Sequence, residues 1–337
     1  MKAIGFKTSL PISAEESFIE FETTVPQPSG RDILVKINAI SVNPVDYKIR
    51  QNSAKDTILE SPKVIGWDAT GTIEAVGEAV TFFKPGDAVY YAGDLTRSGS
   101  NTEYQLIDER IVGLKPSTLS NAEAAAMPLT ALTAWESLYD RIRISEQKDK
   151  GKSILIIGGA GGVGSIAIQL AKKISGLKVI TTASRTETKE WCLAMGADFV
   201  VDHKNLVEEI RSAGYQEVDF ILDFVDLNGY WDAIVELIKP QGHIVSITGS
   251  ATPVALNKLK NKSVTFSWEL MYTRSMYKTD DMEEQHHILN KLSEHFDNGT
   301  LKTTLKTTLK GFTAENLKEA HRLLESGKTI GKVVIEY

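Results

Sequence analysis

The chain has 337 residues, of which 42% are hydrophobic and 24% charged, with a formal net charge of −6. This length exceeds one comfortable hydrophobic core, which favours two domains, and the acidic balance argues against nucleic-acid and anionic-membrane partners. The single cysteine, Cys192, excludes internal disulfides and multi-cysteine metal sites. Without an apolar leader or a membrane-length apolar run, we expect a cytoplasmic protein.

The first 120 residues are typical of an all-β region. Segments 32–40, 70–76 and 87–91 alternate apolar and polar residues, and turn signals separate them. Beyond Asn121, which we expect to be a helix N-cap, an Ala- and Leu-rich stretch to residue 139 predicts a helix interrupted at Pro128.

From residue 151 to about 267, short apolar strands alternate with helical stretches, which predicts a parallel sheet covered on both faces. Six strands with a glycine loop after the first are typical of a doubly wound Rossmann domain. The expected strands are 154–157, 178–182, 198–201, 218–222, 243–247 and 263–266; the helices between them are 164–174, 187–195, 204–213, 228–238 and a short piece at 254–260.

The tail predicts a helix at 281–297, a helix at 313–326 and a last strand at 331–336. Its Thr-rich segment 301–309 places leucine at every fourth residue, and the threonines favour a strand. We therefore expect an α/β protein in which a cofactor domain, residues 124–269, is inserted in a β-rich domain built from residues 1–123 and 270–337.

The most informative segment is 153–164, where an apolar run ends in five glycines and a helical pattern follows. The pattern G-x-G-x-x-G falls on Gly159, Gly161 and Gly164. We expect this loop, including Ala160, Gly162 and Val163, to bring bare backbone N–H groups to the pyrophosphate of a dinucleotide. A tight turn without a ligand is the alternative.

The end of the second Rossmann strand indicates which nicotinamide cofactor binds. NAD sites place an acid there for the ribose, whereas this chain continues with Ser184 and Arg185, and Lys189 lies one turn on. These three residues suit the 2′-phosphate of NADPH. Alternatively, they form a solvated helix start at which Glu187 offsets the cations.

Several motifs in the same order resemble the medium-chain dehydrogenase/reductase superfamily, and within it the zinc-independent quinone oxidoreductase branch. They are Asn43-Pro44-Val45-Asp46, Gly66-Trp67-Asp68, Gly71 to Gly77, Lys84 to Val89, Pro128 to Trp135 and the glycine loop. The segment Trp268 to Arg274 resembles a subgroup labelled zinc-type alcohol dehydrogenase-like. The resemblance implies a GroES-like fold for the β-rich domain and a homodimer formed by edge strands near 263–268.

Despite that label, the residues argue against zinc. In zinc-dependent relatives a cysteine and a histidine occupy the positions that align with Asn43 and Trp67, and this chain offers an amide and an indole there. The segment 91–103, which aligns with a lobe carrying four structural cysteines, has none. We therefore expect no metal site. We expect Cys192 to be a small buried hydrophobic residue, and we expect His286-His287 to lie on a solvated helix face.

NADPH without a Lewis acid suits substrates that accept hydride readily, so we expect a small-molecule quinone or α,β-unsaturated carbonyl. An enoyl-thioester reductase, or an NADPH-binding protein with a structural or RNA-binding role, is the alternative. By the resemblance, Asn43 and Tyr47 orient or protonate the substrate, and Trp67 and Trp268 line its pocket. A turn role for Asn43 and packing roles for Tyr47 and Trp67 remain open.

The family positions and the Rossmann rule imply further cofactor contacts. For His203 an exposed loop is an equal possibility, and His243 is expected to be structural. The remaining candidates are Thr133, Phe224, Val225, Ser246, Ile247, Thr248, Glu269, Met271 and Lys332.

Overall fold

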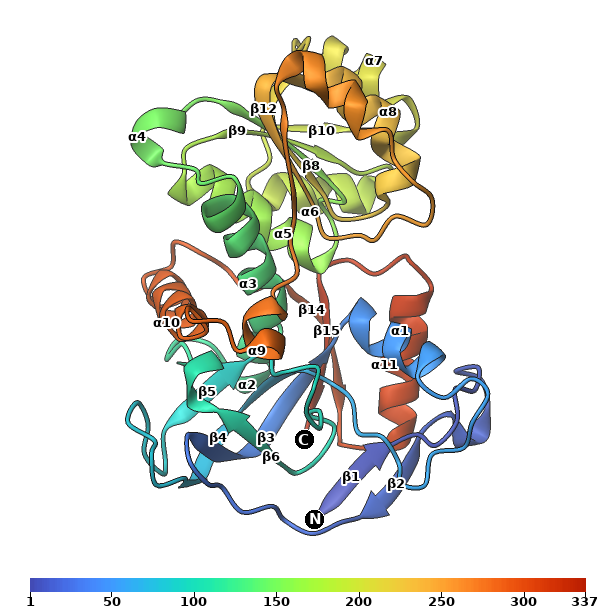
Figure 1. Cartoon of the computed structure of the whole chain (residues 1–337), viewed down its shortest axis with the longest axis vertical. Coiled ribbons are helices and arrows are strands. Elements are labelled where there is room, and N and C mark those ends of the chain that lie inside the picture. Colours follow the sequence, from blue (N-terminus) through green and yellow to red (C-terminus); the bar gives the residue numbers. More distant parts are fainter. The chain divides into compact units, whose positions relative to one another are not determined.

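The computed structural model describes all 337 residues, which divide into two compact units (Figure 1). Unit 1 comprises residues 1–129 and 272–337, and unit 2 comprises residues 130–271. The boundaries expected from the sequence, after residues 123 and 269, lie slightly N-terminal of these.

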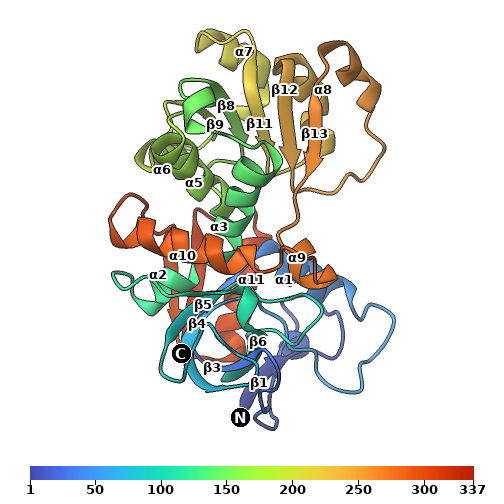
Figure 2. The same ribbon diagram turned by 60° about the vertical axis from the view of Figure 1, so that its left-hand side comes forward.

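Unit 2 contains a six-stranded sheet in the order β10-β9-β8-β11-β12-β13, in which every neighbouring pair is parallel. Figure 2 shows β8, β11, β12 and β13 side by side. The central strand β8 is buried at every residue, as expected of an apolar run covered on both faces. The Rossmann prediction is thus confirmed. The bounds are β8 Ser153–Ile157, β9 Lys178–Thr182, β10 Phe199–Val201, β11 Val218–Asp223, β12 Ile238–Ser246 and β13 Thr265–Trp268.

Four helices of unit 2, α5 to α8, pack against this sheet, and aliphatic residues such as Leu155, Ile221 and Ile234 form its core. The helix expected at 164–174 begins earlier and changes to π geometry at Leu170, and the last strand begins at Thr265 rather than 263. The bounds are α3 Pro128–Trp135 with a π-helical continuation Glu136–Arg141, α4 Glu146–Asp149, α5 Gly162–Gln169 with a π-helical continuation Leu170–Ile174, α6 Thr186–Met195, α7 Leu206–Ser212 and α8 Leu227–Leu237; 3-10 turns lie at His203–Asn205 and Leu256–Lys262.

Unit 1 is built around a seven-stranded sheet in the order β14-β15-β3-β4-β5-β7, with β6 also paired to β3. The C-terminal strand β15 pairs antiparallel with β3, so both ends of the chain form one sheet, as predicted. The Thr-rich segment forms β14, whose side chains alternate in exposure. The bounds are β3 Asp32–Val42, β4 Asp68–Val76, β5 Ala88–Tyr91, β6 Tyr104–Asp108, β7 Val112–Leu114, β14 Leu305–Lys310 and β15 Lys332–Glu336; β1 Lys2–Gly5 and β2 Ile19–Glu22 form a separate pair.

One expectation about the helices of unit 1 is wrong, and another holds only in part. The N-cap of α2 is Ser120, because its Oγ accepts from Glu123 N while the Glu123 carboxylate accepts from Ser120 N. His287 is exposed as expected, but His286 is only partly exposed, since its ring stacks on Phe82 with centroids 4.5 Å apart and Nδ1 lies 2.7 Å from Val112 O. The bounds are α1 Pro44–Asn52, α2 Asn121–Ala125, α9 Thr273–Tyr277, α10 Glu284–Asp297 and α11 Ala314–Glu325, with 3-10 turns at Glu15–Ser17 and Glu109–Ile111.

Cys192 is fully buried, as expected, and burial raises the pKa of its thiol to about 12. No helix in the structure combines the length and the apolar character needed to cross a bilayer.

Candidate cofactor and substrate sites

The carboxyl ends of four strands in unit 2 lie in one row. Asp223 of β11 is in register with Ile157 of β8 and with Ser246 of β12, and Ser246 is in register with Trp268 of β13. The glycine loop and the segments after Asp223, Ser246 and Trp268 therefore leave the sheet at the same edge. This edge is where open parallel sheets bind ligands.

The glycines of the loop are required for different physical reasons. A Cβ on Gly159 would lie 1.9 Å from Thr181 Oγ1, and one on Gly164 would lie 2.2 Å from Gly158 O, so packing within the fold requires both. Gly161, the N-cap of α5, has room, since its Cβ would meet only Gly158 O at 3.5 Å. A bare backbone at the N-terminus of a helix, with open space in front of it, fits a pyrophosphate.

Hydroxyl groups hold the loop in place. Thr182 Oγ1, at the end of β9, accepts from Gly158 N at 2.9 Å. Ser165 Oγ donates to Gly161 O at 2.7 Å and accepts from Trp191 Nε1 at 2.8 Å. The loop is therefore anchored to β9 and to α6 on both sides of Gly161.

The predicted phosphate-binding residues follow β9 directly. Ser184 and Arg185 are exposed, and Lys189 is half-buried one helical turn beyond Arg185. Arg185 Nη1 lies 3.2 Å from Glu187 Oε1 with both side chains exposed, so Glu187 partly neutralises the charge of Arg185 in this structure. An exposed pair of this kind contributes little free energy, and the guanidinium is able to exchange it for a phosphate. His203 is partly exposed beside Asp202.

Among the remaining candidates of unit 2, Thr133, Glu269 and Met271 are buried, whereas Val225 and Trp268 are each 52% exposed. The Glu269 carboxylate binds Arg141 Nε at 2.6 Å and thereby fixes the segment that follows β13. Phe224, Ile247 and Thr248 are half-buried, and His243 binds Ser267 Oγ. Sequence reasoning missed Asp223, although a carboxylate ending an apolar strand is a recognisable signal.

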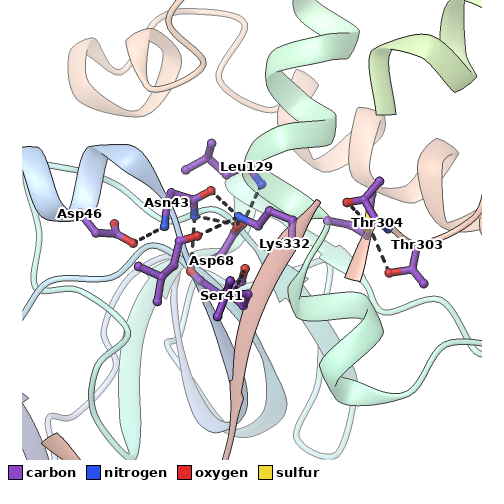
Figure 3. Close-up of polar contacts among 11 residues, drawn as sticks. Ser41, Asn43, Asp46, Asp68, Leu129, Thr303, Thr304 and Lys332 are labelled. Atoms are coloured by element: carbon purple, nitrogen blue, oxygen red, sulfur yellow. Dashed lines mark hydrogen bonds and ion pairs between the residues drawn. The ribbon is translucent and has the colours of Figure 1, made fainter. Parts of the chain in front are cut away.

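A second polar cluster lies in unit 1, where β3, β4 and β15 come together (Figure 3). Lys332 Nζ lies 2.9 Å from Asp68 Oδ2 and also donates to Asn43 Oδ1. Asn43 Nδ2 donates to the same Asp68 oxygen at 2.8 Å, and Leu129 N donates to the other at 2.7 Å. Asn43, Asp68 and Lys332 are at most 3% exposed. The predicted contact of Lys332 with a cofactor stays a prediction.

Asp46 and Tyr47 begin α1 next to this cluster. Burial raises the pKa of Asp46 to about 7, which Asp68 also favours, against the lowering effects of the Asn43 N–H and Lys332. Asp46 Oδ2 accepts from Asn43 N at 2.7 Å, whereas Oδ1 has no hydrogen-bond partner in the protein. Burial and the charge of Glu325 raise the pKa of the half-buried Tyr47. Tyr47 therefore keeps its proton at neutral pH.

The comparisons with known proteins agree with this architecture. The family model of the alcohol dehydrogenase GroES-like domain matches residues 29–132, and that of a zinc-binding dehydrogenase matches residues 195–335. A zinc-type alcohol dehydrogenase-like protein of Staphylococcus aureus is 46% identical over 338 residues, which cover 99% of each chain. The chain belongs to the medium-chain dehydrogenase/reductase superfamily.

Two further members of this superfamily are informative. The chloroplastic NADPH-dependent alkenal/one oxidoreductase of Arabidopsis thaliana is 32% identical over 325 residues, which cover 94% of this chain and 75% of that protein. The structure of the Escherichia coli quinone oxidoreductase complexed with NADPH superimposes with a TM-score of 0.84, at 26% identity and with all of both chains covered. As a member of the superfamily, this chain is an oxidoreductase.

The zinc ion that gives part of the superfamily its name does not fit the residues present here. Trp67 is 1% exposed and its Nε1 donates to Asp94 O at 3.0 Å, so the indole packs in the core and is not a metal ligand, while its place in a substrate pocket stays a prediction. Asn43 and Asp68 already bind the ammonium of Lys332. No group of three or more His, Cys, Asp or Glu side chains is arranged to hold a metal ion.

Proposed function

We propose that this oxidoreductase uses NADPH to reduce quinones or α,β-unsaturated carbonyls, without a metal ion. The observation that carries the proposal is the end of β9, where Ser184, Arg185 and Lys189 follow the strand and the position that holds the ribose-binding acid of NAD sites carries no Asp or Glu. The NADPH complex of the Escherichia coli neighbour and the activity named for the Arabidopsis relative support the two halves of the proposal.

Unit 2 supplies the groups that would hold NADPH. The backbone from Gly159 to Gly164 suits the pyrophosphate, since it presents helix N-terminal amides beside the open space at Gly161. Arg185 and Lys189 supply a forked donor and a point charge for the 2′-phosphate. The segments that follow β11, β12 and β13 are assigned to the nicotinamide half. When bound, NADPH supplies the hydride.

Unit 1 supplies the polar groups that we assign to the substrate. Hydride addition to a quinone or enone places negative charge on an oxygen, which hydrogen-bond donors stabilise. Tyr47 carries a proton at neutral pH and is half-buried, so its hydroxyl is our candidate donor. Asn43 is held rigidly by Asp68 and Lys332, which makes it a positioning residue for the start of α1.

Cofactor titrations with Arg185→Ala test the central assignment. Losing a charge-assisted contact to phosphate costs about 1.5–3 kcal/mol, so the Kd for NADPH should rise roughly ten- to a hundredfold while the Kd for NADH stays nearly unchanged. Arg211→Ala is the matched control, since Arg211 of α7 forms a similarly exposed pair with Glu236 of α8. Equal losses for both cofactors, or none for either, would remove the NADPH assignment from this segment.

Steady-state assays test the reaction. Purified protein should oxidise NADPH with phenanthrenequinone and with a panel of enones, and should oxidise a simple alcohol with NADP⁺ poorly. A chelator should leave these rates unchanged, and elemental analysis should find no stoichiometric zinc. One zinc ion per chain, or a rate lost on chelation and restored by zinc, would overturn metal independence.

A further inference from the structure

We propose that Asp223, Ser246 and Thr248, here called the Asp223 cluster, are positioning residues that hold two cofactor-binding loops of unit 2 in one arrangement. The inference rests on the proposed function, because the loops it concerns are those assigned above to NADPH. It adds Asp223, and it assigns to Ser246 and Thr248, already candidates for cofactor contact, a role through hydrogen bonds inside the protein.

The cluster joins the loops after β11 and β12. Asp223 is fully buried, and its Oδ2 accepts from Ser246 Oγ at 2.8 Å and from Thr248 Oγ1 at 2.9 Å. Ser246 Oγ also accepts from Thr248 N at 3.2 Å. One carboxylate oxygen therefore fixes the chain where it leaves β12.

The other oxygen fixes the chain where it leaves β11. Asp223 Oδ1 accepts from Val225 N at 3.1 Å and from Asp226 N at 3.2 Å. Thr248 Oγ1 reaches the same segment, since it accepts from Leu227 N, at the start of α8, at 3.1 Å. The two loops and the helix start thus share one network, and displacement of either loop breaks bonds to the other.

The position of the cluster separates this role from ordinary packing. Asp223 follows aliphatic residues of β11 such as Ile221 and Leu222, and a buried carboxylate is expensive there unless hydrogen bonds satisfy it. Its bonds go to the loops at the carboxyl edge and to the last residue of β12. The backbone that it holds, at Val225 and at Thr248, lies on the same edge as the glycine loop.

The same strand offers a matched control at its other end. Asp219, near the start of β11, accepts from both Ser153 N and Ser153 Oγ, at 2.8 and 2.7 Å. This is also a Ser–Asp pair between neighbouring strands of one sheet, but it lies at the amino edge, away from every residue assigned to NADPH. Ser153→Ala therefore reports on the general effect of losing such a bond.

Direct titration of NADPH, followed by calorimetry or by cofactor fluorescence, tests the proposal together with the Tm of each variant. The double variant Ser246→Ala/Thr248→Val should raise the Kd for NADPH about tenfold or more, since each lost hydrogen bond corresponds to roughly fivefold. Ser153→Ala should lower the Tm without changing the Kd. Thr248→Ser, which keeps the hydroxyl, should bind NADPH like the wild type, whereas Thr248→Val alone should not.

A double variant that binds NADPH within twofold of the wild type would overturn the proposal, as would an equal loss in Ser153→Ala. If the double variant does not fold, the Kd of Thr248→Val for NADPH tests the proposal instead, because this single variant leaves the buried Ser246–Asp223 bond intact. Failure of the proposed function gives a different result: the wild type itself would bind no nicotinamide cofactor.

Discussion

Asp46 caps helix α1 with a buried carboxylate, and this burial lowers the stability of the folded protein at neutral pH. Its carboxylate completes the capping box at the start of α1, where Asn43 N donates to Oδ2, and it is 1% exposed. Burial disfavours the charged form, so the folded protein retains a proton on Asp46 up to about pH 7, whereas the unfolded chain loses it near the ordinary pKa of Asp. The folded state therefore binds more protons between about pH 4 and 7, and the contribution of Asp46 to the free energy of unfolding falls as pH rises through this window.

We predict that Asp46→Asn removes this dependence, because an amide oxygen still accepts from Asn43 N and carries no charge. The difference in unfolding free energy between variant and wild type should move in favour of the variant by roughly 2–4 kcal/mol from pH 4 to pH 8. Urea unfolding at several pH values measures it. Asp56→Asn, at an exposed loop position, is the control and should show no such trend. A difference that stays flat with pH would contradict the assignment.

At the scale of residues, the sequence predicts local motifs better than long-range contacts. The glycine loop is predicted from its own pattern, whereas the roles of Asn43 and Tyr47 are implied by the resemblance to the superfamily and stay predictions. For Trp67 the sequence leaves a pocket wall and core packing open, because nothing in its motif indicates that Asp94 O accepts from the indole. The bond between Lys332 and Asp68 joins residues 264 positions apart, and only the pairing of β15 with β3 brings them together.

At the scale of elements, α11 shows how a helical pattern can bury a titratable group. Leu317, Ala320 and His321 form its buried face, and His321 is fully buried with its ring edge-on to Phe18 at a centroid distance of 4.9 Å. Neither ring nitrogen has a hydrogen-bond partner in the protein. Burial, together with the charge of Arg50, lowers the pKa of His321 to about 3.

From this we predict an acid sensitivity localised to α11. The folded state keeps His321 neutral while the unfolded chain takes up a proton below about pH 6.5, so the free energy of unfolding falls as pH drops toward 3, by at most about 1.4 kcal/mol per pH unit. His321→Leu should remove this component, so that its stability relative to the wild type rises between pH 7 and pH 5 in thermal or urea unfolding. His287→Gln, at an exposed site, serves as control. An unchanged pH profile in His321→Leu would contradict the prediction.

Hydrophobic periodicity predicts most of the observed helices and strands, and the exceptions have physical causes. The predicted strand 178–182 is β9, and the break expected at Pro128 separates α2 from α3. The π-helical continuations after Trp135 and Gln169 carry no signal, since an α and a π turn accommodate the same apolar residues. The last Rossmann strand is shifted because Ser263, with φ of 49°, ends a 3-10 turn that extends to Lys262.

At the scale of the whole molecule, the edges of the two sheets differ in how they oppose association. The β14 edge in unit 1 presents Lys306 and Lys310, which hinder pairing with another strand. The β13 edge in unit 2, Thr265–Trp268, contains no charged residue and ends in the half-exposed Trp268. The opposite edge of that sheet, β10, is only three residues long and lies between Asp198 and Asp202. The β13 edge is therefore the one best suited to pair with a second copy.

We accordingly predict a homodimer in which β13 pairs antiparallel with β13 of a second copy. Light scattering at micromolar concentration should give about twice the 37.1 kDa of the chain. A lysine at the exposed Thr265 would face its own copy or a close neighbour across the two-fold axis, so Thr265→Lys should weaken the dimer about tenfold or more through like-charge repulsion. Phe199→Lys places the same charge on β10 and should leave the mass unchanged. A wild type that is monomeric, or a dimer lost in Phe199→Lys and kept in Thr265→Lys, would exclude β13 as the interface.

Because the Asp223 cluster and the glycine loop depend only on bonds within one chain, a monomeric Thr265→Lys should still bind NADPH with the affinity of the wild type.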